Sequence, residues 1–333
     1  QSCRTKGFSV AILDTNAEHL TDEQAFERVK DIDPRLVCVV VYGQNPNSGT
    51  TEMDGAIRLA NYIKQNSDYK ICFVGSHTSA LPKEVLSYES VDFVLLNEGV
   101  YALHNLLKTD LKTSLHNVNG IGWKQDNILV LNTPQTPVQT INMNIDLPGY
   151  AWDLLPYKEK PLDLYRSHYW HADYQDKYRT PFAALYTSLG CSFKCKFCMI
   201  NILNRVDNSD NVVSSNSATM RFWTPEFIIK EFDKLVNMGV TTIRISDEMF
   251  LLNRKYYEPL LKLLIERGYG KILKMWTYSR IDTVRSEHHL ELLRKAGIEW
   301  VALGIESGNT NVRQDVTKGS FQDTDIKNVI QKI

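Results

Sequence analysis

Long apolar runs, a surplus of charge of one sign and a large number of cysteines are all missing from this 333-residue sequence. An apolar run such as Leu36 to Tyr42 (LVCVVVY) is far shorter than the ~18 residues that a membrane-spanning helix requires. The 38 basic and 39 acidic side chains give a formal net charge of -1, which offers no electrostatic attraction for nucleic acid or an anionic membrane. With 43% hydrophobic residues the chain is not disordered, and its length suggests about two domains. We therefore expect a globular protein with no membrane span and no nucleic-acid partner.

Cysteines are few, and their distribution argues against a disulfide-stapled fold. Three are scattered, at Cys3, Cys38 and Cys72, and three fall within eight residues, at Cys191, Cys195 and Cys198. Three clustered thiols cannot all pair with one another, and disulfide frameworks belong mainly to short secreted chains. The opening residues QSCRTKG also lack the apolar segment of a secretory signal. We therefore expect a cytoplasmic protein with a metal at the clustered cysteines and with the scattered cysteines in its core.

Residues 1–115 alternate short apolar runs with amphipathic stretches. The pattern predicts strands at 8–13, 36–42, 70–74 and 91–96. It predicts helices after the capping box Thr21-Asp-Glu-Gln24, at 51–65, around Pro82 and at 100–107. Alternating strands and helices of this kind build a doubly wound, Rossmann-like α/β sheet.

The pattern changes in residues 116–180 and then returns to α/β repeats in residues 181–333. The middle stretch, rich in proline and glycine, predicts a hairpin and a linker. The last stretch predicts strands at 183–188, 242–245, 272–277 and 300–305, with helices starting at Thr224-Pro225-Glu226, at 255–266, at 286–296 and at 323–333. Four repeats form only part of a TIM-type (β/α) barrel, because a complete one needs ~250 residues.

The segment SLGCSFKCKFCMI places the three clustered thiols at a CxxxCxxC spacing directly after a predicted strand. Three thiolates on one loop can each hold one iron of a cubane cluster and leave the fourth iron open. Lys194 and Lys196 would favour the thiolate forms. Zinc remains an alternative with His168 or His171 as a fourth ligand, as do thiols that bind nothing.

The stretch CSFKCKFC resembles the signature of the radical S-adenosylmethionine superfamily, in which an aromatic residue, here Phe197, precedes the last cysteine. Around it, LYTSLG resembles the first barrel strand of that superfamily, and RFWTPEFIIKEFDKLVNMGVTTIRISDEMF its first helix and second strand. The stretches MWTYSRID and WVALGIESGN resemble its third and fourth strands. The resemblance implies a 4Fe-4S cluster on Cys191, Cys195 and Cys198 whose open iron binds S-adenosylmethionine, with the protein orienting both cofactors.

The same resemblance implies which residues contact S-adenosylmethionine. They follow the predicted barrel strands, on the face where barrel enzymes place their chemistry. Besides Phe197, they are Ser246, Asp247 and Glu248 after the second strand, Ser279 and Arg280 after the third, and Glu306 after the fourth. The glycine-rich form of the motif after the second strand is absent. Alternatively, the Asp247-Glu248 pair only caps a loop, and Arg280 pairs with Asp282.

The N-terminal part resembles the cobalamin-binding domain of one radical S-adenosylmethionine branch, which includes the anaerobic magnesium-protoporphyrin ester cyclases and many methyltransferases. The resemblance lies in KGFSVAILDT, VVVYGQNPNSGT, FVGSHTSALPKEVL and VDFVLLNEGV. It implies that loops at the carboxyl ends of the strands hold cobalamin. The residues concerned are Gly43, Ser48, Gly75, Ser76, His77, Glu98 and Gly99.

Two departures from that branch stand in the sequence. No Asp-x-His-x-x-Gly motif occurs, so no histidine is positioned to bind cobalt from below. The run from Lys6 resembles the second strand of the cobalamin domain, so we expect its first strand and the last barrel strands to be missing from the sequence. A purely structural sheet remains the alternative to a cobalamin site, because a fold does not fix its ligand.

These observations lead to one functional expectation with open alternatives. We expect a radical S-adenosylmethionine enzyme with a 4Fe-4S cluster, S-adenosylmethionine and cobalamin, which transfers methyl groups to an unactivated carbon. The resemblance also implies an external electron donor of the flavodoxin or ferredoxin type. The alternatives are a radical cyclase or rearrangement enzyme, a non-catalytic iron-sulfur carrier, and a zinc-binding module. The sequence identifies neither a substrate nor a catalytic residue.

Overall fold

The computed structural model describes residues 1–42, 46–208, 214–284, 286–316 and 321–333. The chain forms two compact units. The sheet unit contains residues 2–139 and 192–219, and the barrel unit contains residues 1, 140–191 and 220–333. The segment that begins directly after Cys191 therefore belongs to the sheet unit, although it interrupts the sequence of the barrel unit.

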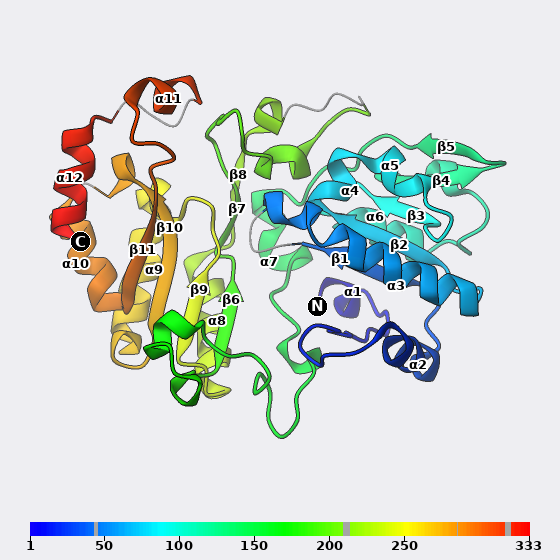
Figure 1. The fold of residues 1–333 in the computed structure, drawn as a ribbon, viewed down its shortest axis with the longest axis horizontal. Helices are drawn as coiled ribbons and strands as arrows, with labels where there is room; N and C mark the ends of the chain where they lie inside the picture. The colour runs from blue at the N-terminus through cyan, green and yellow to red at the C-terminus, as the bar shows by residue number, and fades with distance from the viewer. Residues whose placement is uncertain (43–45, 209–213, 285, 317–320) are drawn as a thin grey trace. The chain divides into compact units, whose positions relative to one another are not determined.

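The sheet unit is built on a five-stranded sheet with the order β1-β2-β3-β4-β5 (Figure 1). Its strands are β1 (Val37–Val41), β2 (Ile71–Gly75), β3 (Phe93–Leu95), β4 (Ile121–Gln125) and β5 (Ile128–Leu131). The first three strands are parallel, and the predicted hairpin, β4 with β5, continues the same sheet in antiparallel pairing. Parallel pairing brings the carboxyl ends of β1, β2 and β3 to one edge of the sheet.

Helices cover both faces of this sheet, which confirms the doubly wound arrangement. They are α1 (Ser2–Thr5), α2 (Asp22–Ile32), α3 (Met53–Asn66), α4 (Ser76–Ala80), α5 (Pro82–Ser87) and α6 (Val100–Leu107). One core cluster joins Ile57 and Ile63 of α3 to Phe73, and the other joins Leu106 of α6 to Cys72. The alternation of side chains along a strand sends residues 72 and 73 to opposite faces, so β2 contributes to both clusters.

The predicted capping box and one predicted strand near the N-terminus have different outcomes. At α2, Thr21 Oγ1 accepts from the Gln24 amide at 3.2 Å and Gln24 Oε1 accepts from the Thr21 amide at 2.9 Å, which confirms the box. The predicted strand at 8–13 is wrong, because these residues have no strand assignment. Ile12 in this run is 40% exposed. An apolar pattern alone does not make a strand when no neighbouring strand pairs with it.

The barrel unit contains a four-stranded parallel sheet with the order β11-β10-β9-β6. Its strands are β6 (Phe182–Leu185), β9 (Thr242–Ile245), β10 (Lys274–Arg280) and β11 (Ile298–Gly304). A separate antiparallel pair, β7 (Ser188–Gly190) with β8 (Met220–Phe222), follows β6. The helices are α7 (Met143–Asp146), α8 (Pro225–Asn237), α9 (Arg254–Glu266), α10 (Glu287–Ala296), α11 (Thr310–Asp315) and α12 (Asp323–Lys332). Strand and helix alternate as the sequence predicts, and the four strands form a partial TIM-type barrel.

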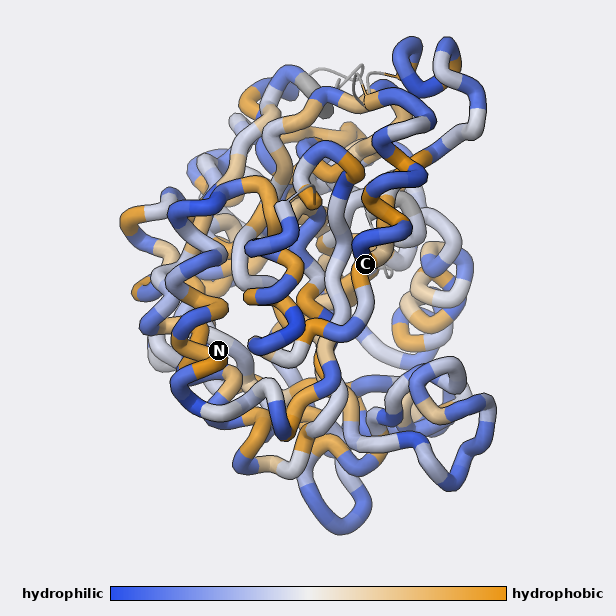
Figure 2. Tube along the Cα trace, turned by 90° about the vertical axis from the view of Figure 1, so that its left-hand side faces the viewer, coloured by the Kyte–Doolittle hydropathy of each residue, from blue (hydrophilic) through white to orange (hydrophobic). Residues whose placement is uncertain are grey.

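Local sequence explains where these helices begin and which face they bury. Thr224 caps α8 by accepting from the Phe227 amide at 3.2 Å, and Pro225 occupies the first turn, where its missing amide hydrogen costs nothing. Phe232 and Leu235 of α8 are fully buried. In Figure 2 the helix that ends at the C-terminus, α12, alternates between hydrophilic and hydrophobic residues, as an amphipathic helix does.

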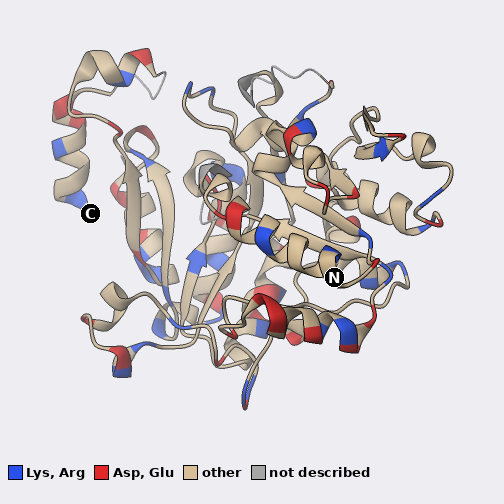
Figure 3. Cartoon of the chain, turned by 45° about the vertical axis from the view of Figure 1, so that its right-hand side comes forward, with Lys and Arg blue, Asp and Glu red and all other residues tan. Residues whose placement is uncertain are grey.

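Charged side chains of both signs are interspersed along the chain (Figure 3). The opposite charges pair locally, for example Arg58 with Asp22 at 2.7 Å and Arg267 with Asp233 at 3.1 Å. No helix in the described ranges is long and apolar enough to cross a lipid bilayer.

Candidate functional site

The three clustered cysteines lie directly after β7. Cys191 is buried at the end of the barrel-unit segment, whereas Cys195 and Cys198 are partly exposed and belong to the sheet unit. None of the three forms a disulfide, and the Cys198 amide donates to the Cys195 carbonyl at 3.1 Å in a turn. Within the described residues, no three His, Cys, Asp or Glu side chains are close enough to hold one metal ion together. The loop therefore supplies the donor chemistry of an iron-sulfur cluster, three thiols that form no disulfide, without a preformed metal geometry.

The other predicted members of this loop region are placed differently. The ring of Phe197, between the last two cysteines, is 45% exposed. His168 and His171, the zinc alternative, lie in an aromatic cluster of the barrel unit, where His171 is 4.5 Å from Trp300 between ring centroids. Burial, followed by the charge of His168, lowers the pKa of His171 to about 4. The two histidines therefore belong to ring packing in the barrel unit.

Asp247 follows β9 and faces the backbone that leads to the cysteine loop. Its Oδ1 accepts from the Thr187 amide at 2.6 Å, and its Oδ2 accepts from the Thr187 and Ser188 hydroxyls at 2.7 and 2.5 Å. Burial raises the pKa of Asp247 to about 6, against the lowering effect of these hydrogen bonds. Both carboxyl oxygens of Asp247, a predicted S-adenosylmethionine contact, therefore already accept hydrogen bonds from the protein.

Ser246 and Glu248 flank Asp247 at the carboxyl end of β9. The Ser246 amide donates to the Leu185 carbonyl at 2.8 Å, which extends the pairing of β6 with β9. Oε2 of Glu248 is buried and has no hydrogen-bond partner among the described residues. Burial, with a smaller effect of Asp247, raises the pKa of Glu248 to about 8. A buried carboxyl oxygen without a partner fits a cationic ligand, and the amino group of S-adenosylmethionine is one.

Replacement of Glu248 with glutamine is expected to change how stability depends on pH. The raised pKa means that the folded state holds a proton on Glu248 that the unfolded chain has released between pH ~4.5 and about 8. The free energy of unfolding of the wild type should therefore fall as pH rises through this window. The Glu248→Gln chain should lack this contribution. Its free energy of unfolding, relative to that of wild type, should therefore rise by roughly a few kcal/mol between pH 4.5 and pH 8.5.

Urea unfolding of both chains at several pH values measures this effect. Five of the six tryptophans lie in the barrel unit, so tryptophan fluorescence reports mainly on that unit. Any constant cost of burying the amide shifts the curve of the variant without changing its slope. Parallel stability curves for the two chains would show that Glu248 ionises normally in the folded protein.

The predicted residues on β10 and β11 have separate environments. Ser279 is buried, and its hydroxyl is 2.6 Å from that of Thr283. Arg280 binds Asp282 through two contacts, Nε to Oδ1 at 2.9 Å and Nη2 to Oδ2 at 2.8 Å, so the ion-pair alternative is confirmed. Glu306 is exposed, with φ of 64° just after β11. Parallel pairing brings the ends of β9, β10 and β11 to one edge, but only Glu248 offers a carboxyl oxygen without a protein partner among the predicted residues described there.

The carboxyl-end edge of the sheet unit carries the predicted cobalamin residues. Gly43 lies outside the described residues, and Ser48 lies in a 3-10 helix, Pro46–Thr50. Gly75 ends β2 with φ of 154°, and a Cβ at this position would lie 2.1 Å from the carbonyl oxygen of Val41 on β1. The glycine therefore allows β1 and β2 to pair up to their ends.

Ser76 and His77 follow Gly75 and are buried. Nδ1 of His77 is 3.1 Å from the Thr50 hydroxyl, and Nε2 is 3.3 Å from Oε1 of Glu84. Both ring nitrogens therefore have protein partners. Thr50 and Glu84 orient the imidazole, and neither nitrogen is available to bind a metal.

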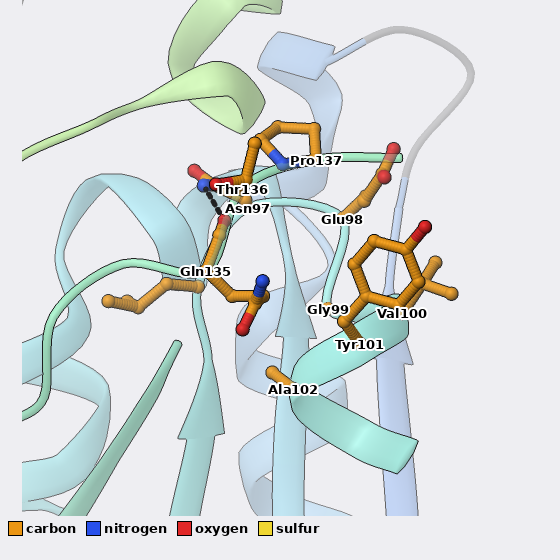
Figure 4. Close-up of a pocket in the computed structure, with 10 residues that line it drawn as sticks. Asn97, Glu98, Gly99, Val100, Tyr101, Ala102, Gln135, Thr136 and Pro137 are labelled. Atoms are coloured by element: carbon orange, nitrogen blue, oxygen red, sulfur yellow. Dashed lines mark hydrogen bonds between the residues drawn. The ribbon is translucent and has the colours of Figure 1, made fainter. Parts of the chain in front are cut away.

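The end of β3 forms a small pocket with the chain segment that follows β5 (Figure 4). Asn97 donates through Nδ2 to the Gln135 carbonyl at 2.9 Å, shown as a dashed line in Figure 4. Oε1 of Glu98 accepts from the Val138 amide at 2.5 Å. Gly99 has φ of 71°, and a Cβ there would lie 3.0 Å from Val74. The pocket at this edge is therefore closely packed where Gly99 lies against Val74.

The buried polar atoms of this edge that have no hydrogen-bond partner in the part of the chain that the structure describes include Oγ1 of Thr78 and Oδ1 of Asn97. Unsatisfied polar atoms at the carboxyl ends of parallel strands fit a polar ligand, because this is where open α/β sheets bind ligands. The residues present therefore fit a nucleotide-bearing cofactor such as cobalamin.

One connection in the sheet unit has no signal in the sequence. Arg205, seven residues after Cys198, is 2% exposed and donates through Nη1 to the Ser79 carbonyl at 2.7 Å and through Nε to the Asp207 carbonyl at 2.8 Å. Asn97 donates through Nδ2 to the Arg205 carbonyl at 3.0 Å. The segment that carries two of the three cysteines is therefore attached to the ends of β2 and β3.

Comparison with known families assigns the two parts of the chain separately. Residues 1–107 match the B12 binding domain, and residues 185–328 match the radical SAM superfamily. The cofactors of these two families are cobalamin for the first, and a 4Fe-4S cluster with S-adenosylmethionine for the second, which is the set that the sequence predicts.

Curated relatives match nearly the whole chain. An uncharacterized methyltransferase of Pyrococcus horikoshii is 24% identical over 320 residues, which are 93% of this chain and 60% of the relative. The anaerobic magnesium-protoporphyrin IX monomethyl ester cyclase of Synechocystis is 22% identical over 330 residues, 96% of this chain and 57% of the relative. The chain thus spans less than two thirds of the length of these relatives.

Two solved structures share the fold. The radical S-adenosylmethionine methyltransferase TsrM from Kitasatospora setae, solved with tryptophan and an S-adenosylmethionine analogue, has a TM-score of 0.74 at 15% identity and matches 99% of this chain and 60% of its own. The cobalamin-dependent S-adenosylmethionine radical enzyme OxsB has a TM-score of 0.63 at 20% identity over 94% of this chain and 41% of its own. The chain thus carries a B12 binding domain (residues 1–107) followed by a radical SAM domain (residues 185–328).

Proposed function

We propose that this chain is the cofactor-binding part of a cobalamin-dependent radical S-adenosylmethionine enzyme that transfers a methyl group to an unactivated carbon. With its cofactors bound, such a protein obtains one electron from the cluster to cleave S-adenosylmethionine to a 5'-deoxyadenosyl radical, and methyl-transfer chemistry from cobalamin. The polypeptide binds and orients these groups and keeps water away from them.

The observation that carries this proposal is the attachment of the cysteine segment to the cobalamin edge. Cys195 and Cys198 belong to the sheet unit, and the chain that follows them is held at the ends of β2 and β3 through Arg205. The same edge carries buried polar atoms without partners among the described residues. Two of three cluster ligands and the proposed cobalamin site therefore lie in one compact unit, as expected if both cofactors serve one reaction.

The roles of individual residues in this proposal follow from their environments. The cluster would be held by Cys191, Cys195 and Cys198. S-adenosylmethionine would meet Glu248 through its amino group, with Phe197, Ser246, Ser279 and Glu306 as further contacts. Cobalamin would be held at the sheet edge by Gly43, Ser48, Gly75, Ser76, His77, Glu98 and Gly99. We leave Asp247 and Arg280 out of the proposed cofactor contacts. Asp247 accepts hydrogen bonds from Thr187 and Ser188, and Arg280 pairs with Asp282.

Anaerobic reconstitution with iron and sulfide tests the first half of the proposal. The reduced protein should give the EPR signal of a 4Fe-4S cluster, and S-adenosylmethionine should change that signal because it binds the open iron. A cluster whose signal does not respond would indicate an electron carrier instead. Incubation with hydroxocobalamin, removal of the excess and a visible spectrum test the second half, and a protein without a corrinoid spectrum would have a structural sheet.

A radical cyclase is the second candidate, supported by the match to the Synechocystis ester cyclase over 96% of this chain. The two reactions leave different products of S-adenosylmethionine. The proposed methyl transfer, which also uses the radical, produces S-adenosylhomocysteine together with 5'-deoxyadenosine, whereas a reaction that uses only the radical produces 5'-deoxyadenosine without S-adenosylhomocysteine. Both need an external electron donor, for which we propose a flavodoxin or ferredoxin, and we propose the cytoplasm as the location.

A further inference from the structure

Residues 186–188 run from the end of β6 to Ser188, the first residue of β7, and lead to Cys191 three residues later. This segment lies outside the ladder of the four-stranded sheet, which ends at Leu185 on β6. Its backbone groups need other partners, because buried amides and carbonyls are costly when left unpaired. Side chains from three other parts of the barrel unit supply them.

Asp247 makes the strongest of these contacts. It is fully buried, and its two oxygens accept from the Thr187 amide at 2.6 Å, from the Thr187 hydroxyl at 2.7 Å and from the Ser188 hydroxyl at 2.5 Å. Hydrogen bonds to a carboxylate are shorter and stronger than those between neutral groups. A single side chain on the β9 loop therefore fixes both the backbone and the side chains of this segment.

Two tyrosines complete the attachment. The Tyr256 hydroxyl, on α9, donates to the Thr187 carbonyl at 2.5 Å. The Tyr150 hydroxyl accepts from the Tyr186 amide at 2.7 Å and donates to the Tyr186 carbonyl at 3.2 Å. The amide and carbonyl of both Tyr186 and Thr187 thus have side-chain partners, which is unusual because most backbone hydrogen bonds are made to other backbone groups.

We propose that Asp247, with Tyr150 and Tyr256, is a positioning residue for the cluster site. The three side chains hold Tyr186–Ser188 and thereby determine where the chain enters the cysteine loop and where Cys191 lies. This inference rests on the proposed function, because it assumes that Cys191 binds a cluster. It assigns Asp247 a different role from the S-adenosylmethionine contact that its position after β9 predicts.

The test compares Asp247→Ala, Asp247→Asn and Tyr256→Phe with wild type after anaerobic reconstitution. Three quantities are measured: iron per chain, the rate of iron loss to a chelator, and the change in EPR signal that S-adenosylmethionine causes in molecules that retain the cluster. Tyr256→Phe removes one hydroxyl and keeps the ring, so it is the variant that preserves the fold. Glu231→Gln is the matched control, because Glu231 is an equally buried acid of the barrel unit whose partners are Trp152 and Lys234.

For a positioning role we expect Asp247→Ala to lose iron about tenfold faster than wild type, and Tyr256→Phe about threefold faster with a smaller fall in melting temperature than Asp247→Ala. Asp247→Asn should lie between Asp247→Ala and wild type, because its remaining oxygen still accepts from the Thr187 amide. Glu231→Gln should match wild type in iron loss. The response of the EPR signal to S-adenosylmethionine should persist in every variant that retains the cluster.

Other results overturn the inference in distinguishable ways. Iron loss at the wild-type rate in both Asp247→Ala and Tyr256→Phe would show that the segment does not position the cluster. A stable cluster that no longer responds to S-adenosylmethionine in Asp247→Ala would make Asp247 a cofactor contact instead. If Asp247→Ala does not fold, Tyr256→Phe decides alone. Failure of the wild type itself to take up a cluster would reject the proposed function, and the positioning role with it.

Discussion

A chain with Cys195 replaced by alanine is expected to take up less than about a tenth of the iron that wild type takes up on anaerobic reconstitution. The reason is that the loop has three thiols and each would hold one iron. With two thiols left, the cluster has lost a third of its protein ligands, and no three other His, Cys, Asp or Glu side chains lie close together within the described residues to replace them. The EPR signal of the reduced protein should disappear together with the visible absorption of the cluster.

Cys38→Ala is the matched control for this experiment. Cys38 is a free, partly buried thiol in the same unit as Cys195, on β1 beside Cys72. Its replacement removes one thiol from the chain without touching the cysteine loop, so the iron content should stay at the wild-type level. A full signal from Cys195→Ala, or an equal loss from Cys38→Ala, would contradict the assignment of the cluster to the loop.

Much of the fold could be predicted from the sequence because local signals agree with tertiary packing there. The helix α3 has its apolar residues at helical spacing, and α8 begins at the Thr224-Pro225 signal. The run 8–13 was wrongly predicted as a strand because its apolar residues carry no information about a pairing partner. The break of 183–188 into β6 and β7 was also invisible, since it depends on side chains that are distant in sequence.

The site was predictable to the extent that its chemistry is local. The cysteine spacing predicts the cluster ligands, and the position of Glu248 after a strand predicts a cofactor contact. The structure adds the protein partners of Asp247 and Arg280, and Thr187, a partner of Asp247, lies 60 residues from it. The sequence gives no sign of such a pairing, because neither residue type nor spacing specifies it.

The same limit applies to Arg205, whose partners Ser79 and Asn97 are more than 100 residues away. Without the structure an arginine after the cysteine loop reads as an ordinary surface residue, because arginine is rarely fully buried without a partner. Its burial shows that the segment after the loop is part of the sheet unit, a relation that motif spacing alone does not contain.

Arg205→Ala is therefore expected to release this segment from the edge of the sheet. The change removes a buried guanidinium group together with its hydrogen bonds to the Ser79 and Asp207 carbonyls, and it leaves the Ser79 carbonyl without that donor. Loss of such contacts costs about 2 to 4 kcal/mol, which corresponds to an increase of roughly 30- to 700-fold in the opening equilibrium of the segment. Hydrogen exchange of the Ile202 and Arg205 amides, which donate to the Met199 and Ile202 carbonyls, measures that opening.

The control for this experiment is a second arginine of the sheet unit, Arg58. Arg58→Ala removes an ion pair with Asp22 whose arginine side chain is 73% exposed, so it should leave both the exchange and the cofactors unchanged. Arg205→Ala should accelerate exchange in the segment and lower the uptake of both iron and hydroxocobalamin, because the segment carries Cys195 and Cys198 and is attached to the cobalamin edge. If exchange accelerates while both cofactors bind as in wild type, then the attachment serves stability alone, and the two sites do not depend on each other through Arg205.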